Sequence, residues 1–476
     1  MTLNFFETIK AVKAVDCIYN NESLDLNKKN IYNISTDSRE IPLNSIFFAI
    51  KGDKFDGHDF ITQAVENGAL GIVMKKEYAN AAKQFGLHLK NNLVIIMVEE
   101  TTQAFLDLAK YYKSLYNLNK VIAITGSVGK TTTKEFIYAV ISEKYKTHKN
   151  KENYNNEIGL PLTLFDLIGE TEAAVLEMGM SAFGEISRLT KAANPDIAVI
   201  TNIGTSHIEN LGSREGIKKA KLEILEGMNC KSTIILNADE PLLYAEKGRT
   251  GRHEYFYGIN NKDADFIAEN IKCDYKSYVS DVEIRVKESG EVKRFTIPVV
   301  GIHNIYNALP AVIIGITCGL TDNQIQNGLS NFENAKMRQN IYGFRDITII
   351  DDCYNASLES MAAELNVLCE NAKSKNGRKI AVLSDVLESG EYANEIHSKI
   401  GAAIEEKDID MVFLYGENSK IIHDRIKKSC KSFYFTDKNE ISAALFQEIK
   451  RGDTVLFKAS RGMALETVLD DFKNRF

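Results

Sequence analysis

A glycine-rich segment, Thr-Gly-Ser-Val-Gly-Lys-Thr at residues 125–131, has the residue types of a phosphate-binding loop. Apolar residues at 121–124 precede it, and apolar residues at helical spacing follow it, so the sequence predicts strand, loop and helix in that order. Glycines let backbone N–H groups surround phosphate oxygens at a helix N-terminus. Lys130 would reach the β- and γ-phosphates, and the Thr131 hydroxyl would bind Mg²⁺. The expected nucleotide-binding residues of the loop are Gly126, Ser127, Val128, Gly129, Lys130, Thr131 and Thr132.

The spacing of this loop departs from the general pattern. Four residues usually separate the two glycines, whereas Gly126 and Gly129 enclose only Ser127 and Val128. The alternative is a chance Gly-Lys-Thr between a strand and a helix. Because strand and helix flank the loop on the expected sides, we predict that the chain binds ATP.

Composition and charge exclude several classes of protein. A chain of 476 residues has room for about three domains, and 44% hydrophobic with 26% charged residues is ordinary for a soluble globular protein. The net charge of −7 and the pI near 5.8 argue against a nucleic-acid partner, since phosphate contacts need a basic face.

The compartment is predicted from the cysteines and from the apolar runs. The first residues lack the basic start and apolar core of a signal peptide, and no run approaches the ~18 apolar residues of a membrane span. The seven cysteines are scattered, odd in number and without Cys-x-x-Cys spacing, which favours reduced thiols and gives no support to a zinc site. We therefore expect a cytoplasmic protein in which Cys353 is a bystander, not a nucleophile.

Residues 1–105 are expected to form a small α/β domain with short strands at residues 46–50, 71–74 and 93–98. Polar residues and glycines beside the strand ends are typical of a small-molecule site. An arginine there can hold a phosphate or a uracil edge through its fork of donors, although each segment could equally be a turn. The candidates are Ser38, Arg39, Asp56, Gly57 and His58.

Residues 106–332 are expected to form a central domain with a mostly parallel sheet, because strands at residues 173–179 and 196–204 follow the loop. The carboxyl ends of parallel strands face the bound ligand, so Glu177 and His207 fall on the side of the phosphate loop. A carboxylate there suits Mg²⁺, which prefers oxygen ligands. His207 could instead cap a helix or lie in the core.

Other polar residues of the central domain have two interpretations each. Asn155 and Asn156 could meet a ligand or cap the next helix. Lys221 follows Lys218 and Lys219 on a predicted helix, where a solvated face is the alternative.

Two further features complete the predicted central domain. Residues 282–286 and 292–297 alternate around Ser289-Gly290, which predicts a hairpin. Asn304 and Asn307 share one face of an apolar helix, so both amides could meet one ligand.

Residues 333–476 are expected to form a Rossmann-like α/β domain, since apolar strands at 347–352, 379–383, 411–415 and 454–458 alternate with amphipathic helices. No glycine-rich dinucleotide fingerprint follows these strands. The predicted fold class is therefore α/β with three domains, of which the central one has the phosphate loop and a mostly parallel sheet.

Eight motifs occur in order along the chain. They are Thr-Gly-Ser-Val-Gly-Lys-Thr (125–131), Asn-Tyr-Asn-Asn-Glu-Ile-Gly (153–159), Leu-Glu-Met-Gly-Met (176–180), Thr-Asn-Ile-Gly-Thr-Ser-His (201–207), Gly-Ser-Arg-Glu-Gly-Ile-Lys-Lys-Ala-Lys-Leu-Glu (212–223), Gly-Ile-His-Asn-Ile-Tyr-Asn-Ala (301–308), Met-Arg-Gln (337–339) and Asp-Asp-Cys-Tyr-Asn-Ala-Ser (351–357). Together they resemble one family over essentially the whole chain, the ATP-dependent Mur ligases of peptidoglycan synthesis.

The resemblance implies amide ligation in two steps. A carboxylate attacks the ATP γ-phosphate to give an acyl phosphate and ADP, and an amine then attacks the carbonyl as phosphate leaves. Because a carboxylate meets a polyanion, the site needs concentrated positive charge. The resemblance implies two Mg²⁺ sites, one at Thr131 and a second held by Glu177 and His207 with a carbamylated Lys221. The catalytic residues it implies are Lys130, Glu177, His207, Lys221 and Arg338.

The resemblance also assigns binding roles, domain by domain. Arg338 would meet the γ-phosphate after closure, Asp352 would take the ribose, and Asn304 with Asn307 would face the adenine. Ser38 and Arg39 would hold a uridine diphosphate. The residues implied near the muramoyl end are Asp56, Gly57 and His58. Those implied along the tripeptide are Asn155 and Asn156, and those in the dipeptide pocket are Tyr354, Asn355 and Ser357.

Within the family, the chain is most similar to the members that add a dipeptide. It has a domain before the phosphate loop, unlike folylpolyglutamate synthases, and it lacks both a Gly-x-Gly before Lys130 and an Asp-Asn-Pro-Arg motif. The implied substrates are UDP-N-acetylmuramoyl-tripeptide and D-alanyl-D-alanine. Whether the tripeptide ends in lysine or diaminopimelate, and which group is the general base, stay open. We expect a monomer whose domains close around hinges near residues 105 and 332.

Three alternatives stay open at this point. One is another Mur-type ligase that adds a single amino acid. A second is a phosphate-loop ATPase switch, which would need a strand-end Asp in place of Glu177. The third is a nucleotide-binding regulator without activity.

Overall fold

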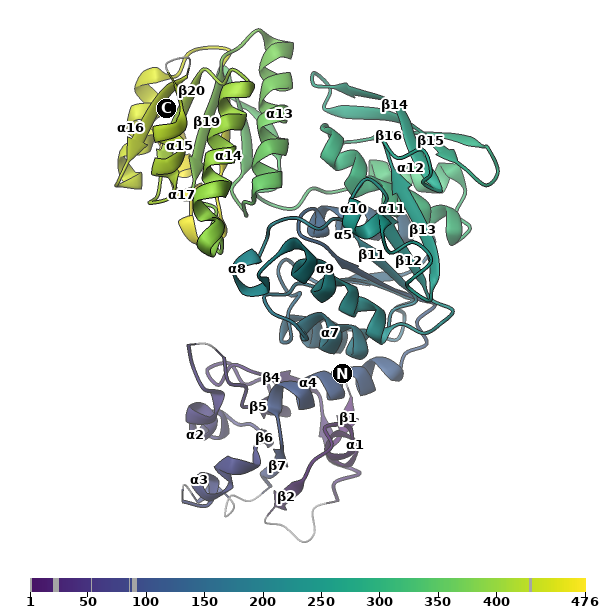
Figure 1. Cartoon of the computed structure of the whole chain (residues 1–476). Coiled ribbons are helices and arrows are strands. Elements are labelled where there is room, and N and C mark those ends of the chain that lie inside the picture. Colours follow the sequence, from purple (N-terminus) through teal and green to yellow (C-terminus); the bar gives the residue numbers. More distant parts are fainter. Residues whose placement is uncertain (1, 20–24, 53, 85, 88–91, 428–429) are drawn as a thin grey trace.

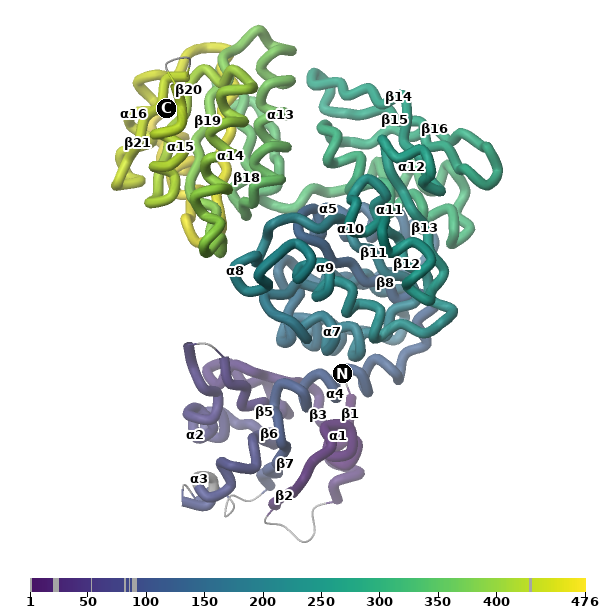
Figure 2. The backbone as a smooth tube through the Cα atoms, in the orientation of Figure 1, coloured from purple at the N-terminus to yellow at the C-terminus, as the bar shows by residue number. Residues whose placement is uncertain are grey.

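Three β-sheets with their covering helices follow one another along the chain (Figure 1). This computed structural model describes residues 2–19, 25–52, 54–84, 86–87, 92–427 and 430–476. The sheets have five, nine and six strands, and a two-stranded sheet pairs β1 (Leu3–Asn4) with β3 (Asn30–Ile31). The backbone trace shows the central unit between the other two (Figure 2). The three-domain α/β fold predicted from the sequence is confirmed.

The N-terminal unit is built on a sheet of order β2-β7-β6-β5-β4, in which only β2 runs antiparallel. The inner strands are apolar on both faces and buried, as strands of a covered parallel sheet must be. The strands are β2 (Asp16–Tyr19), β4 (Asn33–Ser35), β5 (Ser45–Phe48), β6 (Gly71–Lys75) and β7 (Val94–Val98). The helices are α1 (Phe5–Ala11), η1 (Gly57–Phe60), α2 (Ile61–Glu66), η2 (Lys76–Tyr78) and α3 (Ala79–Gln84).

The central unit has a sheet of order β16-β15-β14-β13-β12-β11-β8-β10-β9, parallel from β9 to β14. The predicted hairpin is confirmed, since β15 and β16 pair antiparallel. The strands are β8 (Lys120–Thr125), β9 (Thr147–Lys149), β10 (Ala173–Glu177), β11 (Ile197–Ile200), β12 (Thr233–Asn237), β13 (His253–Gly258), β14 (Phe266–Asp274), β15 (Val279–Val286) and β16 (Val292–Ile297). The helices are α5 (Lys130–Ser142), α6 (Gly159–Phe165), α7 (Glu185–Ala193), α8 (Ile208–Leu211), α9 (Arg214–Leu222), η4 (Glu223–Gly227), α10 (Pro241–Tyr244), α11 (Ile302–Thr317) and α12 (Asp322–Ser330).

Helices cover both faces of the central sheet. Val121 and Ala123 of β8 point into a core with α6 and α7, whereas Ile122 and Ile124 point into a core with α5 and α11. Successive strand residues face opposite sides, so the uniformly apolar β8 belongs to both cores. The sheet thereby presents its carboxyl ends, and not its faces, to a ligand.

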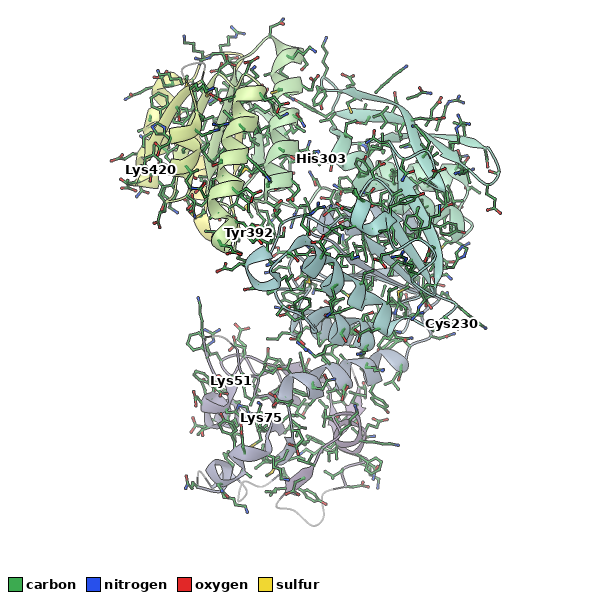
Figure 3. All side chains as sticks on the ribbon, viewed as in Figure 1. Lys51, Lys75, Cys230, His303, Tyr392 and Lys420 are labelled. Atoms are coloured by element: carbon green, nitrogen blue, oxygen red, sulfur yellow. The ribbon has the colours of Figure 1, made fainter. Side chains whose placement is uncertain are left out.

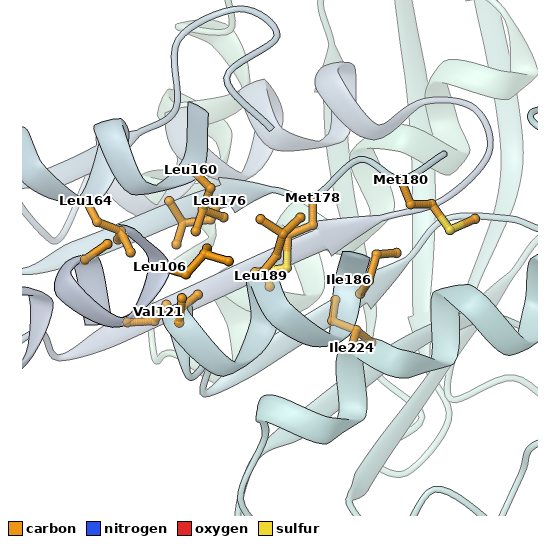
Figure 4. Close-up of a cluster of buried hydrophobic side chains, with 14 of the residues drawn as sticks. Leu106, Val121, Leu160, Leu164, Leu176, Met178, Met180, Ile186, Leu189 and Ile224 are labelled. Atoms are coloured by element: carbon orange, nitrogen blue, oxygen red, sulfur yellow. The ribbon is translucent and has the colours of Figure 1, made fainter. Parts of the chain in front are cut away.

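The helix α4 (Thr101–Ser114) connects the N-terminal and central units. Its Leu106 packs in the same buried cluster as Val121, Leu176 and Leu189 of the central unit (Figure 4). Residue 105 lies inside α4, and the predicted domain boundaries at 105 and 332 stay predictions. No helix in the described part of the chain is long and apolar enough to cross a membrane.

The C-terminal unit has a sheet of order β17-β18-β22-β19-β20-β21, in which only β17 runs antiparallel. Its strands are β17 (Asn340–Phe344), β18 (Ile347–Asp352), β19 (Lys379–Ser384), β20 (Met411–Tyr415), β21 (Lys431–Phe435) and β22 (Thr454–Lys458). Its helices are α13 (Leu358–Lys375), η5 (Gly390–Tyr392), α14 (Ala393–Glu406), α15 (Ser419–Arg425), η6 (Lys438–Glu440), α16 (Ile441–Glu448), η7 (Arg461–Met463) and α17 (Glu466–Asn474).

Polar contacts join the central and C-terminal units. The Tyr392 hydroxyl donates to the Gly212 carbonyl at 2.9 Å, and Thr205 Oγ1 donates to Glu359 Oε2 at 3.2 Å. Figure 3 labels Tyr392 and His303, which both lie where these units face each other. This junction brings the strand ends of the two sheets to a common cavity.

Candidate active site

The phosphate loop lies between β8 and α5, as predicted. Gly126 has φ of +152° and Gly129 has φ of +81°, a region that side chains disfavour. A Cβ at Gly126 would lie 1.9 Å from Thr201 Oγ1, and one at Gly129 would lie 2.1 Å from Asn307 Oδ1. Both glycines are therefore required by backbone conformation and by close packing.

Lys130 begins α5 and turns back over the loop. Its ammonium donates to the carbonyl oxygens of Gly126 at 2.8 Å and Ser127 at 3.3 Å. Burial lowers the pKa of Lys130; the Glu177 carboxylate opposes this, and Arg338 adds to it. The loop thus holds a cation beside the place where its own N–H groups would receive phosphate.

Glu177 ends β10 and contacts the loop. The Thr131 hydroxyl donates to Glu177 Oε2 at 2.8 Å, and Asn155 Nδ2 donates to Glu177 Oε1 at 2.9 Å. Lys134, which is fully buried, places its ammonium 4.0 Å from Glu177 Oε2. Asn150 fixes the backbone of Glu177 through two hydrogen bonds.

Lys134 and Asn150 were not among the predicted site residues. Lys134 lies four residues after Lys130 on α5, and this helical spacing was the only signal in the sequence. Asn156 differs from Asn155, because its Oδ1 accepts the N–H groups of Ile158 and Gly159 at the start of α6. The capping interpretation therefore describes Asn156 in this structure.

Lys221 lies on α9 and is 2% exposed, unlike a lysine on a solvated face. Its neighbours differ, since Lys218 pairs with Glu246 and Lys219 lies over the Phe183 ring. Among the described residues, no carboxylate or hydrogen-bond acceptor pairs with the Lys221 ammonium. Burial, together with the nearby Lys130 charge, lowers the pKa of Lys221 well below its ordinary value.

His207 lies at the start of α8 with a left-handed backbone, φ +61°. Its Nδ1 is 2.5 Å from Glu388 Oε2 of the C-terminal unit, and this contact lowers the pKa of Glu388. The structure shows no contact between His207 and Glu177. Within the described ranges, no three His, Cys, Asp or Glu side chains are grouped to hold a metal ion.

A cavity of about 230 Å³ lies between the central and C-terminal units. It brings together many of the predicted residues, although Gly126, Glu177, His207, Lys221 and Tyr354 do not line it. Those that line it are Ser127, Val128, Gly129, Lys130, Thr131, Thr132, Asn304, Asn307, Arg338, Asp352, Asn355 and Ser357.

Arg338 enters this cavity from the link between α12 and β17. Its guanidinium lies 4.1 Å from the centre of the Tyr354 ring. Met337 and Gln339, on either side, have left-handed backbones with φ of +56° and +47°. Such conformations cost energy in residues other than glycine and cluster at functional sites.

A hydrogen-bond network connects α11 to the end of β18. Asn307 Nδ2 donates to Asn304 Oδ1 at 3.1 Å, and Asn304 Nδ2 donates to Gln339 Oε1. Asp352 accepts the Gln339 N–H at 3.1 Å and pairs with the Lys458 ammonium. Lys458 was not predicted, although it ends β22 beside β18, where a strand-end signal could have indicated it.

A second cavity, of about 160 Å³, adjoins the first and includes His207 and Glu388. Asn355 and Ser357 line both cavities. Ser357 also caps α13 by accepting the Ser360 N–H at 3.2 Å. Cys353 is fully buried, and burial raises the pKa of its thiol well above the ordinary value, so it stays protonated.

The predicted residues of the N-terminal unit form local networks. Ser38 Oγ donates to Gln63 at 2.7 Å, and the Arg39 guanidinium forks onto the Asp37 carboxylate at 2.9 and 2.6 Å. Asp56 accepts the His58 N–H at 3.0 Å and the Tyr78 hydroxyl at 2.9 Å.

Gly57 packs close to the same network. A Cβ there would lie 2.7 Å from the Ile50 backbone. Neither cavity is lined by a described residue of this unit.

The similarity of this chain to known proteins covers most of its length. It matches three families described as "Mur ligase family, catalytic domain" (residues 30–113), "Mur ligase middle domain" (124–315) and "Mur ligase, glutamate ligase domain" (337–461). It is 39% identical over 449 residues to the UDP-N-acetylmuramoyl-tripeptide--D-alanyl-D-alanine ligase of Bacillus subtilis, covering 93% of each chain.

Two solved structures are similar in shape. MurF from Acinetobacter baumannii superposes with a TM-score of 0.87 at 26% identity, covering 100% of this chain and 99% of the other. MurF ligase from Thermotoga maritima in complex with ADP has a TM-score of 0.80 at 29% identity, covering 93% and 97%.

Proposed function

The chain belongs to the Mur ligase family, and we propose that it joins D-alanyl-D-alanine to UDP-N-acetylmuramoyl-tripeptide in an ATP-dependent reaction of peptidoglycan precursor synthesis. The assignment of these two substrates rests on the similarity to the Bacillus subtilis ligase over 93% of both chains. The site supports the chemistry, because buried cations surround a phosphate loop beside a carboxylate and a second cavity.

The first step forms an acyl phosphate. The terminal carboxylate of the tripeptide attacks the γ-phosphorus of ATP, and ADP leaves. Lys130 is placed to exchange the loop carbonyls for phosphate oxygens, and Arg338 would add positive charge on closure. These cations offset the repulsion between two anions and the charge that develops at phosphorus.

The side chains present fit Mg²⁺. The Thr131 hydroxyl and the Glu177 carboxylate are 2.8 Å apart, and both are hard oxygen donors. We propose that Thr131 holds one ion, and that Glu177 and His207 hold a second. When bound, Mg²⁺ would neutralise phosphate charge.

We also propose that Lys221 is carbamylated. Burial without an acidic partner lowers the pKa of Lys221 and so favours its neutral amine, the form that can react with CO₂. The neutral amine attacks the carbon of CO₂, so the Nζ–C bond forms while one C–O π bond breaks and its electron pair moves to oxygen. One proton then leaves nitrogen, and a neutral side chain becomes an anionic carbamate. That anion would support the second metal site and remove the repulsion from Lys130.

The second step forms the amide. The amine of the dipeptide attacks the acyl carbonyl carbon, and phosphate leaves. The second cavity supports a dipeptide site there, because it opens beside His207 and is lined by Asn355 and Ser357. Tyr354 would contribute through the Arg338 that stacks on it.

The remaining assignments complete the three domains, 1–105, 106–332 and 333–476. Ser38 and Arg39 would hold the uridine diphosphate, and Asp352 with Asn304 and Asn307 would order the nucleoside of ATP. The residues proposed for the muramoyl end are Asp56, Gly57 and His58, and those for the tripeptide are Asn155 and Asn156.

An assay of ADP release tests the function. We expect turnover only when UDP-N-acetylmuramoyl-tripeptide and D-alanyl-D-alanine are both present, and tripeptides ending in lysine and in diaminopimelate identify the acceptor. ADP release with neither substrate would indicate an ATPase switch. Turnover with a single D-amino acid in place of the dipeptide would indicate another ligase of the family.

A further inference from the structure

Glu364 is a carboxylate at a core position of α13. Its neighbours on the buried face of the helix are apolar, including Met361, Leu365 and Leu368, and Glu364 itself is only 3% exposed. Burying a carboxylate is costly unless it is paired and hydrogen-bonded. Hydrophobic packing therefore does not explain why a carboxylate is buried at this position.

Only one of the two carboxylate oxygens has a partner among the described residues. Glu364 Oε1 lies 3.3 Å from Nε2 of His303, which begins α11 across the domain junction. Oε2 is shielded from solvent and has no hydrogen-bond partner within the described ranges. Such an oxygen carries its full desolvation cost until a ligand brings a partner.

Glu364 lines the same cavity as the phosphate loop. On α11, Asn307 packs against Gly129 of that loop, and His303 lies four residues earlier, about 6 Å along the helix axis. Glu364, which contacts His303, therefore lies about one helical turn beyond the phosphate cradle. In a nucleotide the sugar is the part that follows the phosphates.

The neighbouring acid, Asp352, already has a partner on each carboxylate oxygen. Asp352 Oδ1 accepts the Gln339 N–H at 3.1 Å, and Oδ2 pairs with the buried Lys458 ammonium. A sugar hydroxyl that donates to Asp352 would share an oxygen with one of these groups, since each carboxylate oxygen has two lone pairs. Glu364 Oε2 is buried in this cavity without a partner, so a hydroxyl that donates to it competes with no other described group.

We propose that Glu364 binds the ribose hydroxyls of ATP through Oε2 and makes the enzyme selective for ribonucleotides. The inference rests on the proposed function, since it requires ATP in this cavity. Burial raises the pKa of Glu364 and the Asp352 charge adds to this, whereas His303 opposes both. A hydroxyl can donate to the ionised carboxylate or accept from the protonated one, so either form can bind the sugar.

Equilibrium binding of nucleotides to the full-length protein tests this proposal. Dissociation constants would be measured for ATP, 2′-deoxy-ATP, 3′-deoxy-ATP and inosine triphosphate. The variants are Glu364→Ala and Glu364→Gln, and the matched control is Glu370→Gln, which makes the same charge change on the exposed face of α13. We expect at least one deoxynucleotide to bind the wild type about tenfold more weakly than ATP.

In Glu364→Ala, ATP should bind about tenfold more weakly and this preference should disappear, whereas Glu370→Gln should match the wild type. Equal binding of ATP and both deoxynucleotides by the wild type would overturn the inference, as would a preference that survives in Glu364→Ala. If Glu364→Ala does not fold, Glu364→Gln and the wild-type nucleotide series decide the question.

Inosine triphosphate distinguishes a contact with the sugar from a contact with the base. If the substitution removes discrimination against inosine triphosphate and leaves discrimination against the deoxynucleotides, Glu364 contacts the base and the ribose assignment is wrong. If the wild type binds no ATP, the proposed function itself fails and the inference falls with it.

Discussion

Substituting alanine at Gly129 should destabilise the central unit through two separable costs. The residue has φ of +81°, and a left-handed backbone costs roughly 1–2 kcal/mol in a residue with a Cβ. The new Cβ would also lie 2.1 Å from Asn307 Oδ1. Asn307 is buried and its amide donates to Asn304 at 3.1 Å, so it cannot move away freely. Overpacking of this kind adds about 1–3 kcal/mol.

Thermal unfolding can separate these two costs. The control is Gly248→Ala, because Gly248 has a similar φ of +75° and no atom within 4 Å of its added Cβ. That variant should lose only the backbone cost, a fall of about 2–8 °C in the thermal midpoint. The thermal midpoint of Gly129→Ala should fall further. Its affinity for ATP should also fall, since the loop must shift to relieve the contact.

A double-mutant cycle between Gly129→Ala and Asn307→Ala isolates the overlap. The two substitutions together should destabilise less than the sum of the single ones, because removing the amide removes the contact. The close packing of α11 on the loop is not what requires a glycine if Gly129→Ala and Gly248→Ala have the same thermal midpoint. The same conclusion follows if the destabilisations by Gly129→Ala and Asn307→Ala are additive.

Three further predictions concern other parts of the molecule. Lys221→Ala should lose most ligase activity and recover part of it in acetate, which supplies the missing anion; activity near that of the wild type would count against carbamylation. Burial alone would raise the pKa of Asp56, but hydrogen bonds from His58 and Tyr78 lower it to about 2, so this group contributes stability above pH 4 that is lost as pH falls towards 2. Asp56→Asn should therefore flatten the acid limb of the stability curve, and an unchanged limb would refute that origin. Small-angle scattering should show compaction when all substrates or their analogues are bound, and an unchanged radius of gyration would contradict hinge closure.

Local pattern was sufficient for the elements that position the site. The phosphate loop, its flanking strand and helix, and the hairpin around Ser289-Gly290 all follow from residue types within a short window. Parallel-sheet geometry then placed Glu177 beside the loop, where it contacts Thr131. These inferences succeeded because strand ends and glycine conformations depend little on distant residues.

The residues that were missed depend on contacts between distant segments. Lys134, Lys458, Glu364 and Glu388 are ordinary charged residues in sequence, and only the packed structure shows that the first three are buried. Glu388 approaches His207 from another domain, so neither residue predicts the contact. Asn155 and Asn156 are adjacent and chemically identical, yet one contacts Glu177 and the other caps a helix.

Three basic side chains of the proposed site already have internal partners, and this affects what binding can gain. Lys130 donates to two loop carbonyls, Arg338 stacks on Tyr354, and His207 contacts Glu388. A phosphate that replaces such a partner exchanges one interaction for another, so its net contribution is smaller than the number of contacts suggests. Glu364 Oε2 differs, because it lacks a hydrogen-bond partner within the described ranges and gains one outright when a ligand supplies it. Selectivity for ligands should therefore depend more on this buried carboxylate than on the basic side chains that surround the phosphates.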